Sequence, residues 1–357
     1  MGANAIVHVI GTGTIGEPLI GLLALFQDEL GIDEITFHKR TPLLTDRSKV
    51  LSLLEKGAKL CVDDDAAKGF QELGMEPAVE AIEAINRAAV VIDCTPSGVG
   101  TANKNQYYEN FTTNTKGFIA QGSEFGFGKP YARGINDSAL KVGEDQFIQI
   151  VSCNTHNLSI LLQTMALADG GPDNLVEGRF VCMRRSNDIS QDSSFVPSPK
   201  VGTHDDERFG THHARDAWHL YKTLGYDLSC FSTAIKLNTQ YMHTIFFDIR
   251  VKNPTSVEKL RAGIDANYRM SVTYKDTANA VFSFGRDQGH YGRILNVTVV
   301  ALPTLTVRKG TEIVGYCFTP QDGNSLLSSI SAACWFLNPD DYQDRIQCLR
   351  PLFHDEV

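Results

Sequence analysis

The 357-residue sequence lacks the residue spacings that commonly hold a metal. Its eight cysteines include no Cys-x-x-Cys pair, and its ten histidines include no His-Glu-x-x-His motif, so neither a zinc site nor a disulfide framework is indicated. The start of the chain also lacks a basic segment followed by a long apolar run. We therefore expect no metal, no targeting segment, no membrane association, and a reducing cytoplasmic location.

Positive charge is in deficit. The chain has 33 Lys and Arg residues against 42 Asp and Glu residues, which gives a formal net charge of −9. This balance argues against nucleic acid or an acidic membrane as a partner, so an anionic partner should be a small molecule. The length exceeds what one compact core usually organises, and it suggests two domains.

The first part of the chain alternates between strand-like and helix-like segments. An apolar, β-branched run at residues 5–10 meets the glycine-rich stretch 11–16, a helix-like segment follows, and a second strand-like run occupies residues 34–40. Further strand-like runs lie at residues 59–62, 89–93, 117–120 and 149–151. This α/β pattern predicts a doubly wound, mostly parallel Rossmann sheet over residues 1–152.

The pattern changes from about residue 178, where longer β-rich runs follow one another with few helices between them. We expect a second, α+β domain at residues 153–320, built on a mixed or antiparallel sheet. The remaining residues, 321–357, contain a stretch at 323–337 that is typical of an amphipathic helix, which we expect to return to the first domain.

The stretch Gly11-Thr-Gly-Thr-Ile-Gly16 has the G-x-G-x-x-G spacing of a dinucleotide-binding loop. It follows a strand and opens a helix, so its backbone can approach a pyrophosphate at the helix N-terminus. The residues expected to contact the cofactor are Gly11, Gly13, Thr14, Ile15 and Gly16. A plain tight turn is the alternative interpretation.

The end of the second strand indicates which dinucleotide binds. An acidic residue there would hold a ribose 2′-hydroxyl, but the chain instead has Lys39, Arg40 and Thr41, which suit a 2′-phosphate. NADP is therefore favoured over NAD as the cofactor, with NAD still possible. The alternative is a solvated basic strand end.

Two more loops follow strands at the carboxyl edge of the predicted sheet, where open α/β sheets bind ligands. The first, at residues 93–100, contains Thr95, Pro96 and Gly98, and the second, at residues 120–126, contains Gln121 and Gly122. We interpret both as cofactor-side loops. The second could equally be an ordinary turn after a strand.

Cys153 follows a strand and opens a helix, where unpaired backbone N–H groups favour thiolate over thiol. A free cysteine is most often a small buried apolar residue, and that interpretation suits Cys61, Cys182 and Cys334 better. Together with a nicotinamide cofactor, a nucleophilic Cys153 indicates covalent oxidation of an aldehyde through a thioester.

Further along the chain, two groups of residues could bind an anion. Arg184 and Arg185 carry planar guanidiniums, and His212 and His213 lie near the start of a predicted helix, so together they could hold a phosphate. Surface charges and ordinary structural histidines are the alternative. His243, in a β-rich run, could be a general base for the thiol or a structural residue.

An ordered series of motifs resembles one family. "GTGTIG", "DCTPSGVG", "QGSE", "VSCNT", "MRR", "VPSP", "THHARD" and "NTQYMH" together resemble the archaeal-type (type II) phosphorylating glyceraldehyde-3-phosphate dehydrogenases, from the first strand to the last helix. The resemblance implies a Rossmann domain, a catalytic domain on a mixed or antiparallel sheet, a homotetramer, and use of NADP or NAD.

The resemblance also implies roles for residues at matching motifs. Cys153 is the nucleophile, and the loops at Gly11–Gly16, Thr95–Gly98 and Gln121–Gly122 hold the cofactor, to which we add Asn324. Residues that would bind the substrate and the attacking inorganic phosphate are Ser152, Asn154, Thr155, Arg184, Arg185, His212 and His213.

The sequence departs from the family pattern in three ways. His156 and Asn157 stand where the family has a threonine and a small residue, and Phe125 stands where it commonly has a lysine. The family's base is the second histidine of a Met-His-x-His strand, whereas an ungapped match places His243 on the first and Ile245 on the second. His243 and His156 are therefore both candidates for the base, and we favour His243.

The resulting hypothesis is NAD(P)-dependent phosphorylating oxidation of glyceraldehyde 3-phosphate, or its reverse, through a Cys153 hemithioacetal and thioester. One alternative is the same chemistry on another anionic aldehyde, such as a phosphonate or carboxylate semialdehyde. A second alternative, from another class of protein, is a non-catalytic NADP-binding redox sensor.

Overall fold

The computed structural model describes residues 4–188 and 193–357. The chain divides into two compact units, which are described separately. The first unit comprises Met1–Arg133, Leu140–Ile150 and Leu326–Arg350, and the second comprises Gly134–Ala139, Val151–Ser325 and Pro351–Val357. Within the described residues, each unit is organised by one eight-stranded sheet.

The sheet of the first unit is parallel throughout, in the order β4-β3-β2-β1-β5-β6-β8-β7. Consecutive parallel strands need a crossover, and helices provide most of these connections. The strands are β1 (Ile6–Ile10), β2 (Glu34–His38), β3 (Lys59–Val62), β4 (Val79–Glu80), β5 (Val90–Asp93), β6 (Gly117–Ala120), β7 (Lys129–Tyr131) and β8 (Phe147–Ile150).

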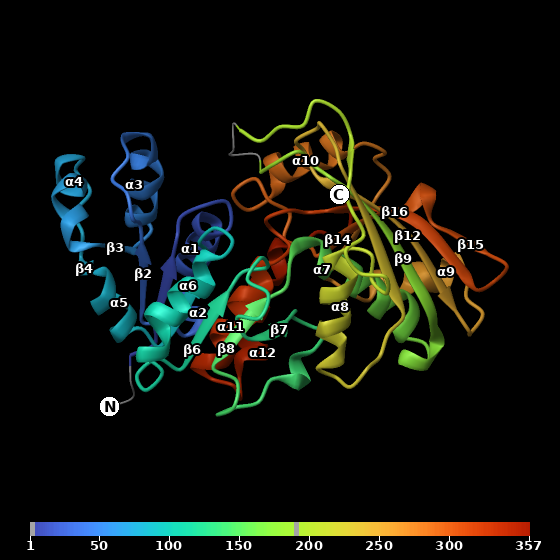
Figure 1. The fold of residues 1–357 in the computed structure, drawn as a ribbon, viewed down its shortest axis with the longest axis horizontal. Coiled ribbons are helices and arrows are strands. Elements are labelled where there is room, and N and C mark those ends of the chain that lie inside the picture. The colour runs from blue at the N-terminus through green and yellow to red at the C-terminus, as the bar shows by residue number, and fades with distance from the viewer. Residues whose placement is uncertain (1–3, 189–192) are drawn as a thin grey trace. The chain divides into compact units, whose positions relative to one another are not determined.

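Helices of the first unit lie beside the strands of this sheet, among them α1 and α11 (Figure 1). One cluster stacks Tyr108 on Phe118 and Phe118 on Phe147, with ring centroids 5.0 and 5.1 Å apart. The helices are α1 (Gly16–Leu25), α2 (Gln27–Leu30), α3 (Arg47–Glu55), α4 (Ala67–Glu72), α5 (Ala81–Arg87), α6 (Val99–Gln106), α11 (Leu326–Leu337) and α12 (Tyr342–Arg345).

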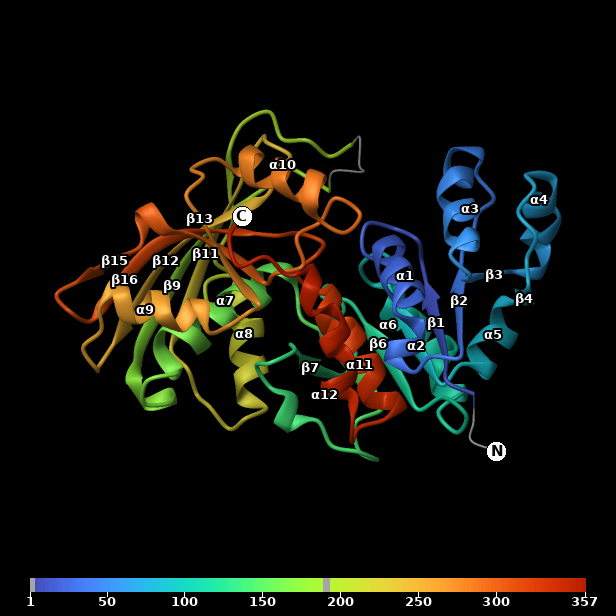
Figure 2. The same cartoon turned by 180° about the vertical axis from the view of Figure 1, so that it is seen from behind.

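Helix α11 lies beside strands that are some 200 residues earlier in the chain. In Figure 2 it is the red helix next to blue-green elements. Every residue from Leu326 to Phe336 is buried, so the expected amphipathic helix is instead enclosed on all sides. Its serines meet polar groups of the first unit: Gln121 donates to Ser329 Oγ (3.1 Å), and the hydroxyls of Tyr131 and Ser331 lie 2.8 Å apart. Small hydroxyl side chains allow this helix to be buried without unpaired polar atoms at these positions.

The sheet of the second unit is mixed. Its order is β10-β11-β9-β12-β16-β14-β13, with β15 paired to β16; β9/β11 and β13/β14 are parallel and the other pairs antiparallel. The strands are β9 (Leu175–Arg184), β10 (Lys200–Val201), β11 (Cys230–Lys236), β12 (His243–Val251), β13 (Met270–Thr273), β14 (Thr298–Ala301), β15 (Thr306–Arg308) and β16 (Glu312–Thr319). The two sheets confirm the predicted fold class.

Strand β12 shows why this sheet has an inner and an outer face. Its residues alternate between buried and partly exposed along the whole strand, as a half-buried strand requires. The helices of the second unit are α7 (Cys153–Leu162), α8 (His212–Lys222), α9 (Val257–Asp265) and α10 (Ala278–Gln288). In the described part of the chain, no helix is both long enough and apolar enough to cross a membrane.

A buried histidine lies inside the first sheet. His8 on β1 is fully buried, and its Nδ1 lies 2.7 Å from Oγ1 of Thr36, its register partner on β2. Burial and, to a smaller extent, the neighbouring His38 together lower the pKa of His8 to about 3. The native state therefore holds this imidazole neutral, whereas an unfolded chain would protonate it near pH 6.5.

We expect the first unit to lose stability as the pH falls below about 6.5, because the unfolded state then binds a proton that the folded state refuses. His8→Asn keeps a polar group near Thr36 but removes this linkage, so it should lose less free energy of unfolding between pH 7 and pH 5 than wild type. Denaturant unfolding at both pH values measures the difference. His204→Asn, at an exposed position, is the control; equal pH dependence in all three proteins would contradict the assignment.

Candidate active site

The predicted residues fall into two sets, one in each unit. The first unit carries the glycine loop and the loops that follow β2, β5 and β6, all at the carboxyl ends of parallel strands. The second unit carries Cys153, the arginines, the histidines and also Asn324. Each set is described within its own unit.

The three glycines after β1 have three different surroundings. Gly11 has a φ of +95°, and a Cβ there would lie 3.0 Å from the carbonyl oxygen of Cys94. A Cβ on Gly16 would lie 2.0 Å from the carbonyl oxygen of Gly11, so only glycine lets α1 begin this close to the loop. A Cβ on Gly13 would meet nothing within 4 Å. The loop is thus closed at its ends and open at Gly13, as backbone approach to a pyrophosphate requires.

The N-terminus of α1 is also open. Among the described residues, no side chain caps this helix at Ile15. Helix α6 differs, because the buried carboxylate of Glu124 accepts hydrogen bonds from Gly98 N (2.5 Å), Thr101 N (2.8 Å) and Thr101 Oγ1 (2.6 Å). The start of α1 can therefore bind an anion, whereas the start of α6 already holds one.

Glu124 also joins the two predicted cofactor-side loops, since it lies on the loop after β6 and binds the loop after β5. A second carboxylate, Asp93 at the end of β5, accepts from Thr95 N (2.9 Å), Asn103 Nδ2 (2.9 Å) and the Tyr108 hydroxyl (2.5 Å). Both loops are consequently held by buried carboxylates. Pro96 lies between Thr95 and Gly98, the two positions of this loop that the carboxylates hold.

The basic residues after β2 are not equivalent. Lys39 Nζ lies 2.5 Å from Asp46 Oδ2, and the Lys39 side chain is 11% exposed. Arg40 and Thr41 are exposed, and within the described residues no ion pair involves Arg40. The free cation beside a ribose 2′-phosphate would therefore be Arg40 rather than Lys39.

In the second unit, Cys153 is the first residue of α7. Ser152 precedes it in an extended conformation and caps the helix, with its Oγ 3.4 Å from Thr155 N and 2.9 Å from Thr155 Oγ1. Asn324 Nδ2 donates to the carbonyl oxygen of Cys153 (2.9 Å), which fixes the backbone at the start of the helix. As a whole residue Cys153 is partly exposed, whereas Asn154 and the rest of the helix are buried.

The resting thiol is protonated, contrary to the expectation from the helix N-terminus. Burial raises the pKa of Cys153 to about 11, and the negative charge of Asp322 also raises it, against Arg185, Arg184 and the Asn154 backbone, which lower it. Loss of hydration therefore outweighs the helix dipole in the free protein. A reaction at Cys153 requires a proton acceptor or a change in the charges around it.

Three buried ring or guanidinium nitrogens near Cys153 have no partner in the described residues: Arg184 Nε, Arg185 Nε and His213 Nδ1. The Nε2 atom of His213 lies 3.4 Å from Asn154 Nδ2, so when that amide donates to it, the ring proton is on Nδ1. Arg184 also lowers the pKa of both His213 and Cys153, which places all three groups in one electrostatic neighbourhood. Unpaired buried donors are costly, and an anionic ligand would satisfy them.

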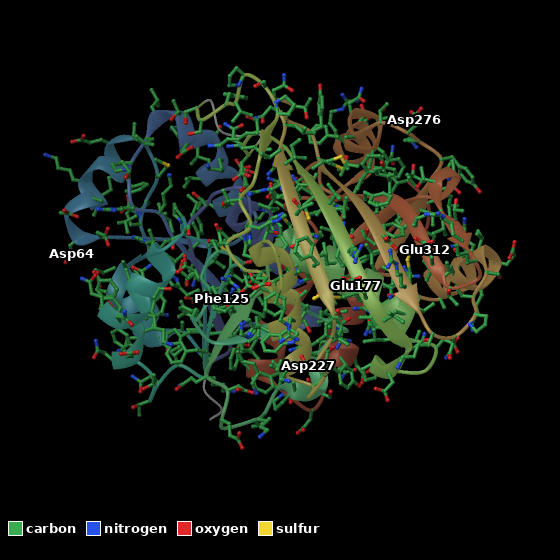
Figure 3. The ribbon with its side chains drawn as sticks, turned by 45° about the vertical axis from the view of Figure 1, so that its right-hand side comes forward. Asp64, Phe125, Glu177, Asp227, Asp276 and Glu312 are labelled. Carbon is green, nitrogen blue, oxygen red and sulfur yellow. The ribbon has the colours of Figure 1, made fainter. Side chains whose placement is uncertain are left out.

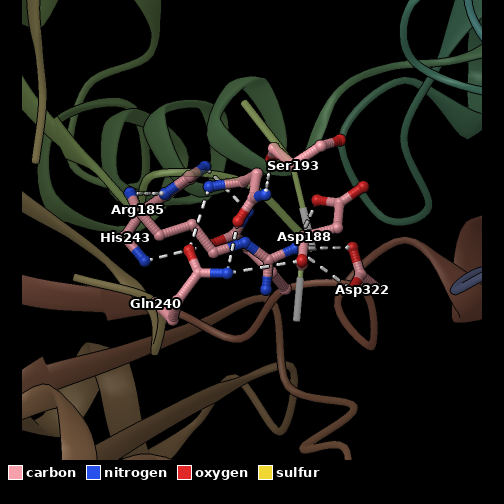
Figure 4. A network of polar contacts seen from close by, with 8 residues as sticks. Arg185, Asp188, Ser193, Gln240, His243 and Asp322 are labelled. Atoms are coloured by element: carbon pink, nitrogen blue, oxygen red, sulfur yellow. Dashed lines mark hydrogen bonds and ion pairs between the residues drawn. The ribbon is translucent and has the colours of Figure 1, made fainter. Parts of the chain in front are cut away.

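Arg185 has a different environment, shown in Figure 4. Its side chain is 3% exposed, and Nη2 lies 2.6 Å from Asp188 Oδ1 and 3.3 Å from Asp322 Oδ2. The backbone N–H of Arg185 donates to His243 Nδ1 (2.9 Å), and His243 Nε2 lies 2.7 Å from Gln321 Nε2. The two arginines thus differ, because Arg185 is compensated by carboxylates and Arg184 is not.

The histidines are neutral in this environment. Burial, followed by Arg185, Arg184 and His213, holds the pKa of His243 well below its usual range. Burial lowers the pKa of His156 to about 4, and its Nδ1 lies 3.1 Å from the carbonyl oxygen of Ser152 on its own helix. His212 is exposed at the start of α8, with its ring centroid 4.0 Å from that of His213.

Sequence reasoning missed three residues that organise these sites: Glu124, Gln321 and Asp322. Glu124 stood inside a predicted loop, but nothing in the sequence connected it to Gly98 and Thr101. Gln321 and Asp322 follow β16 in a turn-like stretch, and their partners are 78 and 137 residues away. Phe125, by contrast, was identified from the sequence as a departure from the family pattern. Its side chain is 49% exposed on the loop after β6 (Figure 3).

Comparison with known proteins finds no matching family model, but it does find curated relatives. The chain is 26% identical over 252 residues to a glyceraldehyde-3-phosphate dehydrogenase of Pyrobaculum arsenaticum, covering 68% of this chain and 66% of the relative. It is 26% identical over 321 residues to the Metallosphaera sedula protein of the same name, covering 86% and 85%. The Methanobacterium bryantii protein of that name is 27% identical over 274 residues, covering 74% and 72%. These similarities confirm the resemblance to the archaeal-type family.

The glycine loop provides a matched test of stability against binding. Gly16→Ala should lower the melting temperature, because its Cβ cannot be accommodated beside the Gly11 carbonyl. Gly13→Ala should leave the melting temperature unchanged and weaken binding of a nicotinamide dinucleotide, because the open side of the loop would be filled. Thermal unfolding and cofactor titration of both variants measure this. Unchanged cofactor affinity in Gly13→Ala would show that the ligand does not approach this loop.

Proposed function

We propose that the protein is a nicotinamide-dependent aldehyde dehydrogenase that oxidises a phosphorylated three-carbon aldehyde, glyceraldehyde 3-phosphate, in a phosphorylating reaction or its reverse. The observation that carries this proposal is Cys153 at the start of α7, with the unpartnered buried donors of Arg184 and His213 in the same neighbourhood. The similarity to proteins named glyceraldehyde-3-phosphate dehydrogenase supports it.

In this proposal, the Cys153 sulfur adds to the aldehyde carbon and the carbonyl oxygen gains a proton, which gives a hemithioacetal. Loss of a hydride from that carbon and of the hydroxyl proton gives a thioester. The bound nicotinamide supplies the hydride acceptor for this oxidation. An oxygen of inorganic phosphate then attacks the thioester carbon, the carbon–sulfur bond breaks, and the products are an acyl phosphate and the Cys153 thiolate.

The anionic groups of the reaction would be bound by Arg184 and His213, since their N–H donors need acceptors. We place His212 at the exposed margin of the same group, where it can assist. Arg185 has its own carboxylates, so we assign it to holding the site together rather than to direct binding of phosphate.

Of the two candidate bases, we propose His243. The Nδ1 atom of His156 is committed to the backbone carbonyl of Ser152, which makes it a positioning residue for the start of α7. The ring of His243 is held at Nδ1 by the backbone N–H of Arg185 and at Nε2 by the side chain of Gln321, so it serves as the base only after one of these contacts is released. Burial and the two arginines hold the pKa of His243 well below its usual range, so the role requires that bound anions offset these charges and raise it. General-base assistance typically contributes ~10²–10⁴-fold to rate.

A second candidate substrate is a carboxylate semialdehyde, undergoing the same thioester chemistry. The observation that favours it is the compensation of Arg185 by Asp188 and Asp322, which leaves Arg184 as the uncompensated guanidinium in this group. One guanidinium matches a carboxylate in a bidentate pair. Comparison of both aldehydes, with and without inorganic phosphate, distinguishes the two substrates.

We expect Cys153→Ser to abolish aldehyde-dependent reduction of the cofactor without changing cofactor affinity, because the loss concerns the nucleophile alone. In wild type, mixing aldehyde with oxidised cofactor in the absence of phosphate should leave an acyl adduct on Cys153, detected by intact and peptide mass spectrometry. Cys348→Ser, at a partly exposed cysteine of the first unit, is the control and should retain full activity. Turnover in Cys153→Ser would overturn the proposal.

For the cofactor, we propose NADP in preference to NAD. Arg40→Ala should weaken NADP binding several-fold more than NAD binding, because NADP alone carries the 2′-phosphate that the exposed guanidinium can meet. Lys39→Ala should change the ratio of the two affinities less, since Lys39 is paired with Asp46. Titration of both cofactors against both variants measures the ratio, and equal losses for NADP and NAD in Arg40→Ala would contradict this role.

A further inference from the structure

The loop between β16 and α11 connects three parts of the second unit. Gln321 Oε1 accepts from the backbone N–H of His243 (3.0 Å), where β12 begins. Asp322 contacts the guanidinium of Arg185, just beyond the end of β9. Asn324 donates to the carbonyl oxygen of Cys153 at the start of α7. Three residues of one short loop therefore determine how Arg185, His243 and Cys153 are arranged.

The guanidinium of Arg185 has two carboxylate partners of different character. Asp188 approaches Nη2 more closely, at 2.6 Å, but its side chain is 43% exposed. Asp322 approaches the same nitrogen with both oxygens, at 3.4 and 3.3 Å, and its side chain is 14% exposed. A charge that is less hydrated acts more strongly on its neighbours, so Asp322 should have the larger electrostatic effect on nearby groups.

The charges that act on Cys153 include Asp322 but not Asp188. Asp322 raises the pKa of the thiol, whereas the guanidiniums of Arg185 and Arg184 lower it. The other titratable groups around this site are the thiol of Cys182 on β9 and the histidines His156, His213 and His243. Burial keeps the thiol protonated and the imidazoles neutral. One carboxylate therefore opposes two guanidiniums at the reactive sulfur, and it is bound to one of them.

We propose that Asp322 is a positioning residue that keeps Arg185 compensated and so adds to the effect of burial in keeping Cys153 an unreactive thiol in the free protein. The inference rests on the proposed role of Cys153 as the nucleophile. The two adjacent arginines then have different roles. Arg184 binds an anionic ligand, whereas Arg185 does not, because its charge is already paired with Asp322. The loop of residues 320–325 then determines the charge at the sulfur as well as its position.

The physical reason for such an arrangement is selectivity of the thiol. A thiolate, not a thiol, reacts with electrophiles and oxidants, so a cysteine beside two uncompensated guanidiniums would react with any of them. Asp322 neutralises the charge of one of these guanidiniums, that of Arg185, so less positive charge acts on the sulfur of Cys153. Ionisation is then left to the step in which the aldehyde and the proton acceptor are both present.

The test measures the reactivity of the Cys153 thiol and not the enzymatic turnover. In the full chain, the rate of Cys153 alkylation by iodoacetamide is followed against pH by peptide mass spectrometry, without aldehyde or cofactor. Asp322→Asn should move the midpoint of this profile to lower pH by about one pH unit or more, because removing a nearby like charge from a poorly hydrated group of charges changes a pKa by that order. Alkylation near pH 7.5 should then be at least ~tenfold faster than in wild type.

Two further variants separate charge from structure. Asp188→Asn neutralises the more exposed carboxylate on the same guanidinium and should leave the midpoint close to that of wild type. Asp322→Glu restores the charge and should also restore the wild-type profile. Asp322→Ser is expected to behave as Asp322→Asn, and it replaces that variant if the asparagine protein does not fold.

An unchanged profile in Asp322→Asn or Asp322→Ser, or an equal displacement in Asp188→Asn, would overturn the inference. So would slower alkylation in the Asp322 variants, which would identify Asp322 as a proton acceptor for the thiol instead. These outcomes are independent of the proposed function: a displaced profile in a protein that oxidises no aldehyde would refute the activity and retain the role of Asp322.

Discussion

Burial of the Arg185 guanidinium is the constraint on which the second unit's site depends. A cation removed from water must be paired and hydrogen-bonded, since its desolvation costs several kcal/mol otherwise. Asp188 and Asp322 supply the pairing, and Asp322 can do so only because the loop after β16 reaches back to the end of β9. The same loop then contacts His243 and the backbone of Cys153. The need to compensate one buried charge therefore fixes the positions of three element ends: the start of α7, the start of β12 and the end of β9.

Much of the first unit could be predicted from the sequence, because its determinants are local. Glycines 11, 13 and 16 follow a β-branched run directly, and their three roles depend on backbone within a few residues or on the adjacent strand end. The alternation of apolar strands and helices likewise predicts a parallel sheet. Helix α11 was predicted as a helix that returns to the first domain, and it belongs to the first unit. Its all-round burial was not predicted, since that depends on strands some 200 residues earlier in the chain.

The sites were less predictable because their chemistry depends on long-range pairs. Cys153 was identified from its position at a strand–helix junction, but the direction of its pKa was not, because local reasoning included the helix N-terminus and omitted desolvation and Asp322. Lys39 and Arg40 look alike as neighbouring cations, and only the pairing of Lys39 with Asp46 separates them. Glu124 and Asp322 carried no pattern at all, since a lone carboxylate in a turn is compatible with a solvated surface. The sequence therefore predicted which elements carry the residues better than it predicted their charge partners.

The carboxylate of Glu124 has a dynamic consequence. Because its two oxygens bind Gly98 and Thr101 from a loop that follows a different strand, neither loop can open without breaking charge-assisted hydrogen bonds to a buried group. The two loops must then open together or not at all, as one cooperative unit of local unfolding. If the proposed cofactor binds at this edge, the two loops would form a rigid wall, and any adjustment on binding would fall to other segments. The loops after β5 and β6 are thus ordered without a ligand, so binding at this edge would cost little conformational entropy in these two loops.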